Sequence, residues 1–288
     1  MLNIYEVMIN MCDFHGTEDF EKVLKLRSLE AWQICGKRPD GVYFGFEFCE
    51  NMLFHCSVES LKENMYGTHE AGYRNVFVIP PLHERYIPEY QSFLEEVLFY
   101  DYTDECVVND IGTLIWVRKK LGWGGPVIFG RLWDKAVREQ RMNLEEIQEI
   151  PVNAREFFKP SVCNEFTKRL AEKFEVKAFE TDTLPNGKLH VTKWEKDYCV
   201  HIHYPRILLS RPAYCEFEGI GKSSDEKFFF RRGCSGLCKA YVKKIGEATD
   251  KCPIYKQGLS LIGFQEKAPE EAIEGRVRLI YSGRQKNE

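Results

Sequence analysis

Three cysteines in the last third of the chain are the residues whose types and spacing most clearly indicate chemistry. Cys234 and Cys238 stand four residues apart in the segment Cys234-Ser-Gly-Leu-Cys238, and Cys215 precedes Cys234 by 19 residues. Iron–sulfur clusters need thiolates, because soft sulfur suits iron and its negative charge offsets that of the cluster core. The small residues between the two close cysteines let backbone N–H groups approach the sulfur atoms. This pattern predicts that the three thiols share one site.

Spacing alone leaves the occupant of this site open. Zinc uses the same donors, although structural zinc sites more often contain cysteine pairs separated by two residues. Unligated thiols are the simplest alternative, because most single cysteines are small buried hydrophobes. The basic side chains of Arg231, Arg232 and Lys239 would stabilise thiolates. Local spacing does not choose a fourth ligand, for which the candidates are Cys49, Cys163, Cys199 and Cys252.

Composition places the chain among cytosolic globular proteins. It has 288 residues, 44% of them hydrophobic and 29% charged, and a formal net charge of −4, which argues against a protein built mainly to bind nucleic acid. Its 11 cysteines are an odd number, which fits poorly with a fully paired disulfide framework. The first residues do not resemble a secretory signal, and no apolar stretch is long enough to span a bilayer. We therefore expect a cytoplasmic protein.

Short β-branched or aromatic segments alternate with longer amphipathic ones along most of the chain. Strands are predicted at residues 2–10, 41–48, 75–79, 105–109, 126–130, 176–180 and 199–204, with further strand-like segments at 259–264 and 278–281. Helices are predicted at residues 18–35, 58–65, 88–100, 111–121, 143–150 and 161–174.

This alternation implies parallel strands with helical crossovers, in a (β/α) barrel or a doubly wound sheet. The number of strands, and the lack of a glycine-rich turn after the first, favour a TIM-like barrel. We expect a single α/β domain over residues 1–288, with an irregular cysteine-rich region at about 209–245.

Polar residues stand where several predicted strands end. Since the carboxyl ends of barrel strands form one rim, they are candidates for a substrate-binding pocket, although each alone is more typical of a turn or a cap. These residues are Asn109, Asp110, Arg131, Glu180 and Asp182. His201 and His203 alternate along one strand and therefore face the same side. We interpret them as ordinary strand histidines.

Four short motifs follow one another along the chain: Glu105-Cys-Val-Val-Asn-Asp110-Ile-Gly, Val127-Ile-Phe-Gly130-Arg131-Leu-Trp-Asp-Lys135, Glu180-Thr-Asp182 and Leu209-Ser-Arg211. In this order they resemble the core motifs of peptidase family U32, the collagenase-like family, over about residues 40–245. The segment Val42-Tyr-Phe-Gly45-Phe-Glu-Phe-Cys49 and the spacing of the last two cysteines resemble the UbiV-like branch of that family, which carries a 4Fe–4S cluster.

The resemblance implies a ligand set and a set of binding residues. Carried over to this sequence, the cluster ligands are Cys49, Cys215, Cys234 and Cys238. Leu208 stands where other branches have a cysteine, which supports Cys49 as the fourth ligand, whereas the loop between Cys215 and Cys234 is longer here. Arg131 or Arg211 would suit the carboxylate of a small-molecule substrate such as prephenate.

Three functions remain open at this point. The resemblance implies a subunit of an oxygen-independent hydroxylase-type enzyme, an oxidoreductase of anaerobic metabolism that pairs with a second U32-family protein in a heterodimer. A collagenase-like peptidase is an alternative, but the sequence contains no recognisable nucleophile–base pair and no hydrolytic metal motif. A non-catalytic iron–sulfur scaffold or electron-transfer protein is the third.

Overall fold

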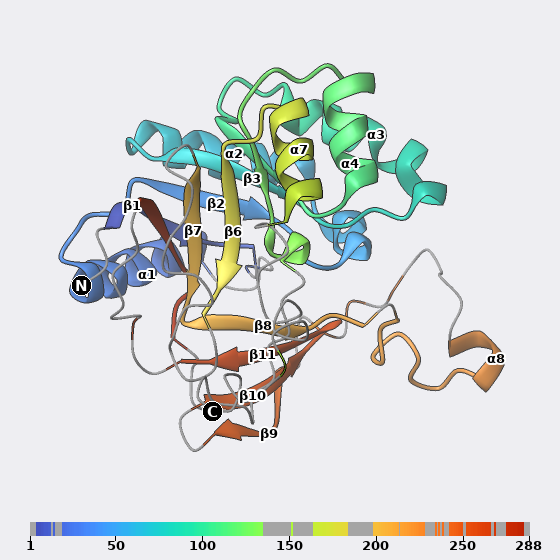
Figure 1. Ribbon diagram of the computed structural model, residues 1–288. Helices are drawn as coiled ribbons and strands as arrows, with labels where there is room; N and C mark the ends of the chain where they lie inside the picture. Colours follow the sequence, from blue (N-terminus) through green and yellow to red (C-terminus); the bar gives the residue numbers. More distant parts are fainter. Residues whose placement is uncertain are drawn as a thin grey trace.

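The computed structural model of the chain describes residues 4–12, 14, 19–134, 151, 164–183, 198–212, 214–227, 234, 236, 238, 242–249, 252–265, 268 and 275–284 (Figure 1). Three predictions concern residues outside these ranges: the helix at 143–150, the beginning of the helix at 161–174, and the basic side chains of Arg231, Arg232 and Lys239. Cys163 also lies outside them.

Eight parallel strands close into a barrel in the order β1-β12-β7-β6-β5-β4-β3-β2. They are β1 (Ile4–Asn10), β2 (Gly41–Gly45), β3 (Arg74–Ile79), β4 (Glu105–Val108), β5 (Val127–Phe129), β6 (Ala178–Asp182), β7 (Cys199–Tyr204) and β12 (Arg276–Tyr281). The structure thus confirms the predicted α/β fold with a TIM-like barrel.

Helices follow the first five strands and pack on the outside of the barrel (Figure 1). They are α1 (Phe20–Cys35), α2 (Val58–Glu70), α3 (Ile87–Leu98), α4 (Ile111–Ile115) with its continuation η3 (Trp116–Lys120), and α7 (Glu165–Lys173). Local sequence sets their ends. In α1, the Asp19 side chain accepts a hydrogen bond from the Lys22 N–H, and Gly36 ends the helix in the left-handed conformation.

Alternation along the strands divides the core into two layers. Side chains such as Val42, Phe44 and Val108 point outward and pack against the helices in the larger hydrophobic cluster. Their neighbours, such as Tyr43 and Val107, belong to a separate cluster inside the barrel. Because successive side chains of a strand point to opposite faces, both layers are built by the same eight strands.

A second, antiparallel sheet is inserted between β7 and β12. It contains β8 (Arg206–Ser210), β9 (Val242–Thr249), β10 (Cys252–Gln257) and β11 (Ser260–Phe264), in the order β8-β11-β10-β9. The expectation of an irregular region missed β8, β9 and β10. The strand expected at 259–264 belongs to this sheet and not to the barrel.

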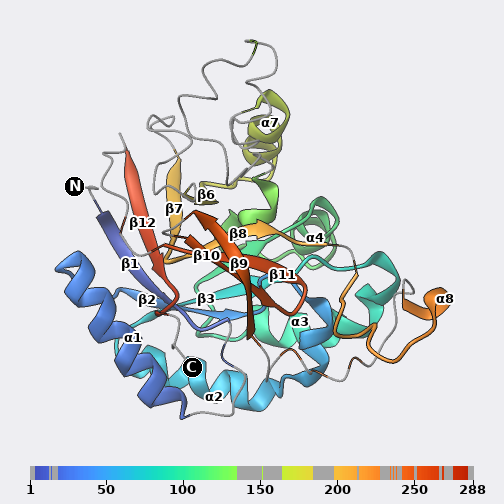
Figure 2. The ribbon, with the colours of Figure 1, turned by 90° about the horizontal axis from the view of Figure 1, so that it is seen from below.

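The inserted sheet covers the end of the barrel at which the parallel strands terminate (Figures 1 and 2). Leu208, Ile262 and Phe264 form a buried cluster that packs against Phe48 and Leu132, which follow β2 and β5. This contact brings the sheet against the rim on which the sites of such barrels form.

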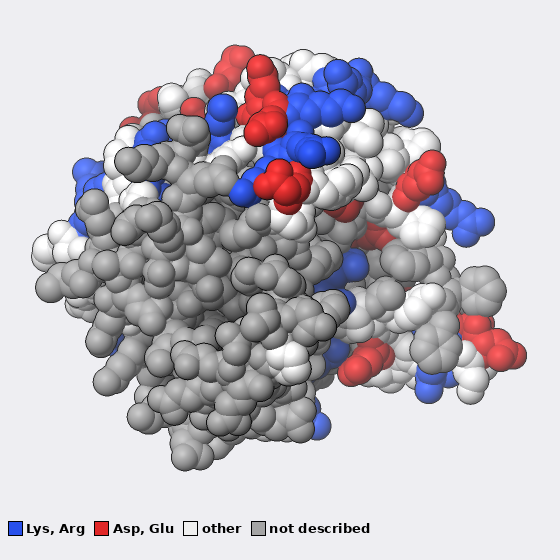
Figure 3. All heavy atoms as spheres, in the orientation of Figure 1, with Lys and Arg blue, Asp and Glu red and all other residues white. Residues whose placement is uncertain are grey.

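The described surface and helices add two observations. On the face seen in Figure 3, acidic and basic residues are interspersed over the helical part at the top of the view. Among the described residues, no helix has both the length and the apolar character needed to cross a bilayer.

Buried ion pairs occupy the opposite, amino-terminal end of the barrel. Arg278 on β12 donates to both carboxylate oxygens of Glu105 on β4, at 2.6 and 2.9 Å, and its guanidinium lies 2.6 Å from Glu6 on β1. Arg74 on β3 also contacts both carboxylates. The Arg278 and Arg74 contacts hold the pKa of Glu105 below its ordinary value even though burial opposes this. Four strands are therefore joined at this end.

We expect Arg278→Met to destabilise the fold by about 3 kcal/mol or more, because it takes an ion-pair partner from the buried Glu105 and from the partly buried Glu6. Urea unfolding of the purified protein measures this loss. Arg276→Met is the matched control. Arg276 lies on the same strand, but it is exposed and its guanidinium lies over the Tyr5 ring, 4.3 Å from the centroid. An equal loss in both variants would contradict the role given to the buried ion pairs.

Candidate metal centre

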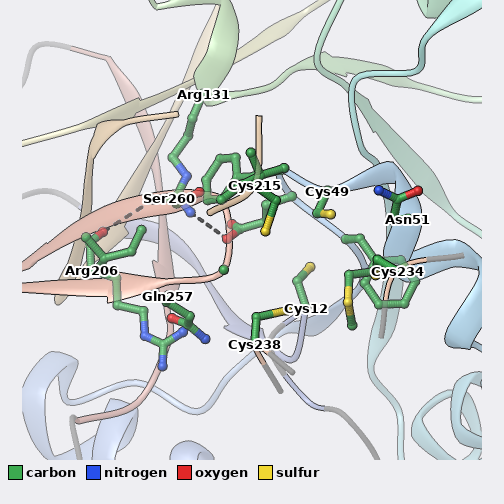
Figure 4. A pocket seen from close by; sticks show the side chains of 17 residues that line it. Cys12, Cys49, Asn51, Arg131, Arg206, Cys215, Cys234, Cys238, Gln257 and Ser260 are labelled. Atoms are coloured by element: carbon green, nitrogen blue, oxygen red, sulfur yellow. Dashed lines mark hydrogen bonds and ion pairs between the residues drawn. The ribbon is translucent and has the colours of Figure 1, made fainter. Parts of the chain in front are cut away.

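Five cysteines line one cavity between the barrel rim and the inserted sheet (Figure 4). The cavity has a volume of about 100 Å³. Its cysteines are Cys12, Cys49, Cys215, Cys234 and Cys238. All four thiols assigned by the family resemblance are in this set, although they come from segments far apart in the sequence.

Cys49 reaches the cavity because β2 ends early. The strand stops at Gly45, whose φ of +100° favours glycine and where a Cβ would lie 2.3 Å from the Val78 carbonyl oxygen. The chain then turns, and Cys49 directly precedes the short helix η1 (Glu50–His55). Burial raises the pKa of the Cys49 thiol to about 12, and negative charge on the three other assigned ligands adds to this effect. The four thiols are thus close enough to influence one another electrostatically.

Cys215 and Cys234 follow β8 in the chain and lie outside helices and strands. The Cys215 carbonyl accepts a hydrogen bond of 3.2 Å from the Gly219 N–H. The Nε2 atom of His55 lies 2.9 Å from the Cys234 carbonyl oxygen and 3.5 Å from its sulfur. His55 therefore connects the segment after Cys49 to the segment that carries Cys234.

Cys12 was not found by sequence reasoning. It follows β1, is buried, and its backbone N–H donates to the Asn10 side chain at 2.9 Å. The available signal was its place at the end of the first strand, next to the strand that precedes Cys49. An isolated cysteine there reads equally well as a buried thiol.

The thiols surround the cavity and do not converge on a point. Within the described residues, no three His, Cys, Asp or Glu side chains are grouped closely enough to hold one metal ion. In Figure 4 the labelled cysteines enter the cavity from different sides. Polar side chains of the inserted sheet, namely Arg206, Gln257 and Ser260, complete the wall.

Arg131 forms the part of the wall that faces the barrel interior. Its side chain is 2% exposed, and its guanidinium lies 2.6 Å from Glu47 and 3.0 Å from Asp182. It also stacks over the Phe48 ring, 4.8 Å from the centroid. Although burial opposes the charge, Glu47 and Asp182 raise the pKa of Arg131 above its ordinary value. Arg131, which the sequence predicted to bind a substrate carboxylate, thus forms ion pairs with two carboxylates of the protein itself.

Glu180 and His203 lie behind Arg131, inside the barrel. The His203 Nε2 atom is 3.2 Å from Glu180, and its Nδ1 atom is 3.6 Å from Glu47. Burial raises the pKa of Glu180 to about 8; Arg131 opposes this rise, whereas Glu47 and Asp182 add to it. His201 faces the same interior, as expected, and lies 3.1 Å from the Tyr43 hydroxyl. Burial lowers the pKa of His201 well below its ordinary value.

Of the six predicted binding residues, Arg131 lines the cavity, Glu180 and Asp182 lie behind it, and the other three contact the backbone of the rim. Asn109 donates to the Ile79 carbonyl at 3.0 Å. Asp110 caps α4 through the Thr113 N–H at 2.7 Å. The Nε atom of Arg211 donates to the Phe48 carbonyl at 2.9 Å. Asp110 thus makes the capping contact that its residue type alone already suggested.

The titration of Glu180 predicts a pH-dependent stability difference. The folded protein holds this proton more tightly than the unfolded chain, whose glutamates titrate near pH 4.3. The stabilisation is therefore complete below that pH and is lost as the pH rises through about 8. We expect the melting temperature of the wild type, relative to Glu180→Gln, to fall between pH 5 and pH 9. Thermal melts of both proteins measure it, and a constant difference would contradict the burial of an ionisable Glu180.

Comparison with protein-family models, with curated proteins and with solved structures finds no match for this chain.

Proposed function

We propose that the protein binds a 4Fe–4S cluster through Cys49, Cys215, Cys234 and Cys238 and acts as a redox protein of the U32-like, cluster-bearing type. The observation that carries this proposal is the shared cavity, which collects these four thiols from both sides of the barrel mouth. The closed parallel barrel, whose strand ends form the mouth, supports it as well.

The arrangement of the thiols favours a cluster over a single ion. In a 4Fe–4S cluster each thiolate binds a different iron, so the ligands surround a volume, as they do here. A zinc ion instead needs four donors within about 2.3 Å of one point. Burial raises the pKa of Cys49, and charge on Cys215, Cys234 and Cys238 adds to this effect, so the four thiols lie within electrostatic reach of one another.

Arg131, which lines the cavity, forms ion pairs with Glu47 and Asp182 beside the thiols. The hydroxylase-type reaction, a carboxylate substrate and the heterodimer with a second U32-family protein belong to the same proposal and rest on the sequence resemblance. The cytoplasmic location belongs to it as well and rests on the lack of a recognisable signal segment in the sequence.

Iron content tests the cluster directly. Protein purified without oxygen is expected to be brown, to absorb broadly near 400 nm and to contain about four irons per chain. Cys215→Ala, Cys234→Ala and Cys238→Ala each remove a ligand and should lose most of this iron. Cys199→Ala is the control, because Cys199 begins β7 at the opposite end of the barrel. A colourless wild type that contains zinc would overturn the proposal.

A second pair of variants tests the fourth ligand. Cys49 and Cys12 both line the cavity. We choose Cys49 as the ligand because charge on the other three thiols raises its pKa, which shows that it lies near them. We expect Cys49→Ala to lose cluster absorbance and iron, and Cys12→Ala to keep both at the wild-type level. The reverse result would assign the fourth position to Cys12.

A further inference from the structure

We propose that Glu180, in contact with His203 inside the barrel, is a proton-binding site whose occupancy is coupled to the charge in the cysteine cavity. When a one-electron donor reduces the cluster, the Glu180 carboxylate takes up one proton and becomes a carboxylic acid. The proposal rests on the proposed function, since the electron enters through the cluster.

A continuous set of contacts leads from the cavity to this pair. Arg131 and Glu47 line the cavity, and their side chains lie 2.6 Å apart. Glu47 lies 3.6 Å from His203, and His203 lies 3.2 Å from Glu180. Arg131 and His203 on this route are buried and the Glu47 side chain is 16% exposed, so solvent screens charge in the cavity less than it would at the surface.

Besides burial, charged groups of both signs act on Glu180. The carboxylates of Glu47 and Asp182 raise its pKa, and Arg131, which contacts both of them, lowers it. Further away, the positive charge of Arg278 at the other end of the barrel acts on Glu180. The Tyr43 ring packs edge-on against His203, with centroids 6.5 Å apart, and it is neutral because burial raises its pKa.

Glu180 is the group of this set that is suited to take up the proton. Glu47 and Asp182 each form an ion pair with the Arg131 guanidinium, at 2.6 and 3.0 Å. Glu180 is 3% exposed, and its Oε1 atom has no hydrogen-bond partner among the described residues. Its pKa of about 8 leaves it close to titration under ordinary conditions. An added electron nearby penalises the carboxylate further, so the reduced protein holds the proton up to a higher pH.

The expected consequence is a pH-dependent reduction potential. Below about pH 8, Glu180 is protonated in both states and the potential changes little with pH. Above it, reduction and protonation occur together, so the potential becomes more negative as the pH rises. Glu180 thus holds a proton near the cavity. A molecule reduced in the cavity would need protons as well as electrons.

The test uses anaerobically purified protein between pH 6 and pH 10. Reduction by dithionite at pH 9 should produce the infrared band of a protonated carboxylic acid, and redox titration should show the potential falling above pH 8. Glu180→Gln should abolish both the band and the fall. His201→Gln is the matched control and should behave as the wild type, because His201 faces the same interior but contacts Tyr43.

Each outcome bears on a separate claim. A wild type that carries the cluster but shows no carboxylic acid band and a constant potential overturns the proton site alone. This measurement needs no variant, so it decides the matter even if Glu180→Gln does not fold. A wild type without a cluster overturns the proposed function, and the proton coupling with it.

Discussion

The buried guanidinium of Arg131 joins the segments that build the barrel mouth. Arg131 follows β5 and pairs with Glu47 beyond β2 and with Asp182 on β6. It also donates to the Arg206 carbonyl, the first residue of the inserted sheet, at 3.4 Å. A buried charge is costly unless it is paired, so removing Arg131 would take this ion-pair partner from both Glu47 and Asp182. The position of Cys49, two residues after Glu47, therefore depends on this cation.

The inserted sheet explains how distant thiols reach the same place. A barrel rim alone would offer Cys12 and Cys49, which follow neighbouring strands. The connection between β8 and β9 carries Cys215, Cys234 and Cys238, and the sheet packs on Phe48 and Leu132 at the rim. Hydrophobic burial, which has no directional chemistry of its own, thus assembles the candidate centre.

The two ends of the barrel use charge in different ways. At the amino-terminal end, Arg278 and Arg74 neutralise Glu6 and Glu105, and the pKa of Glu105 falls. At the mouth, burial together with the carboxylates of Glu47 and Asp182 raises the pKa of Glu180 to about 8. Balanced charge is typical of a structural ion-pair network, whereas a buried group close to titration is typical of a functional site.

Local sequence determined the fold class and the chemistry of the donors. Alternating strands and helices predict a barrel because each pattern depends on residues a few positions apart, and closely spaced cysteines such as Cys234 and Cys238 predict a shared site for the same reason. The sequence could not show that Cys12 enters the cavity or that β8–β11 form a separate sheet. These depend on contacts between segments that are far apart in the sequence. Only tertiary packing decides which polar side chains at a strand end face the cavity and which hold the backbone of the rim.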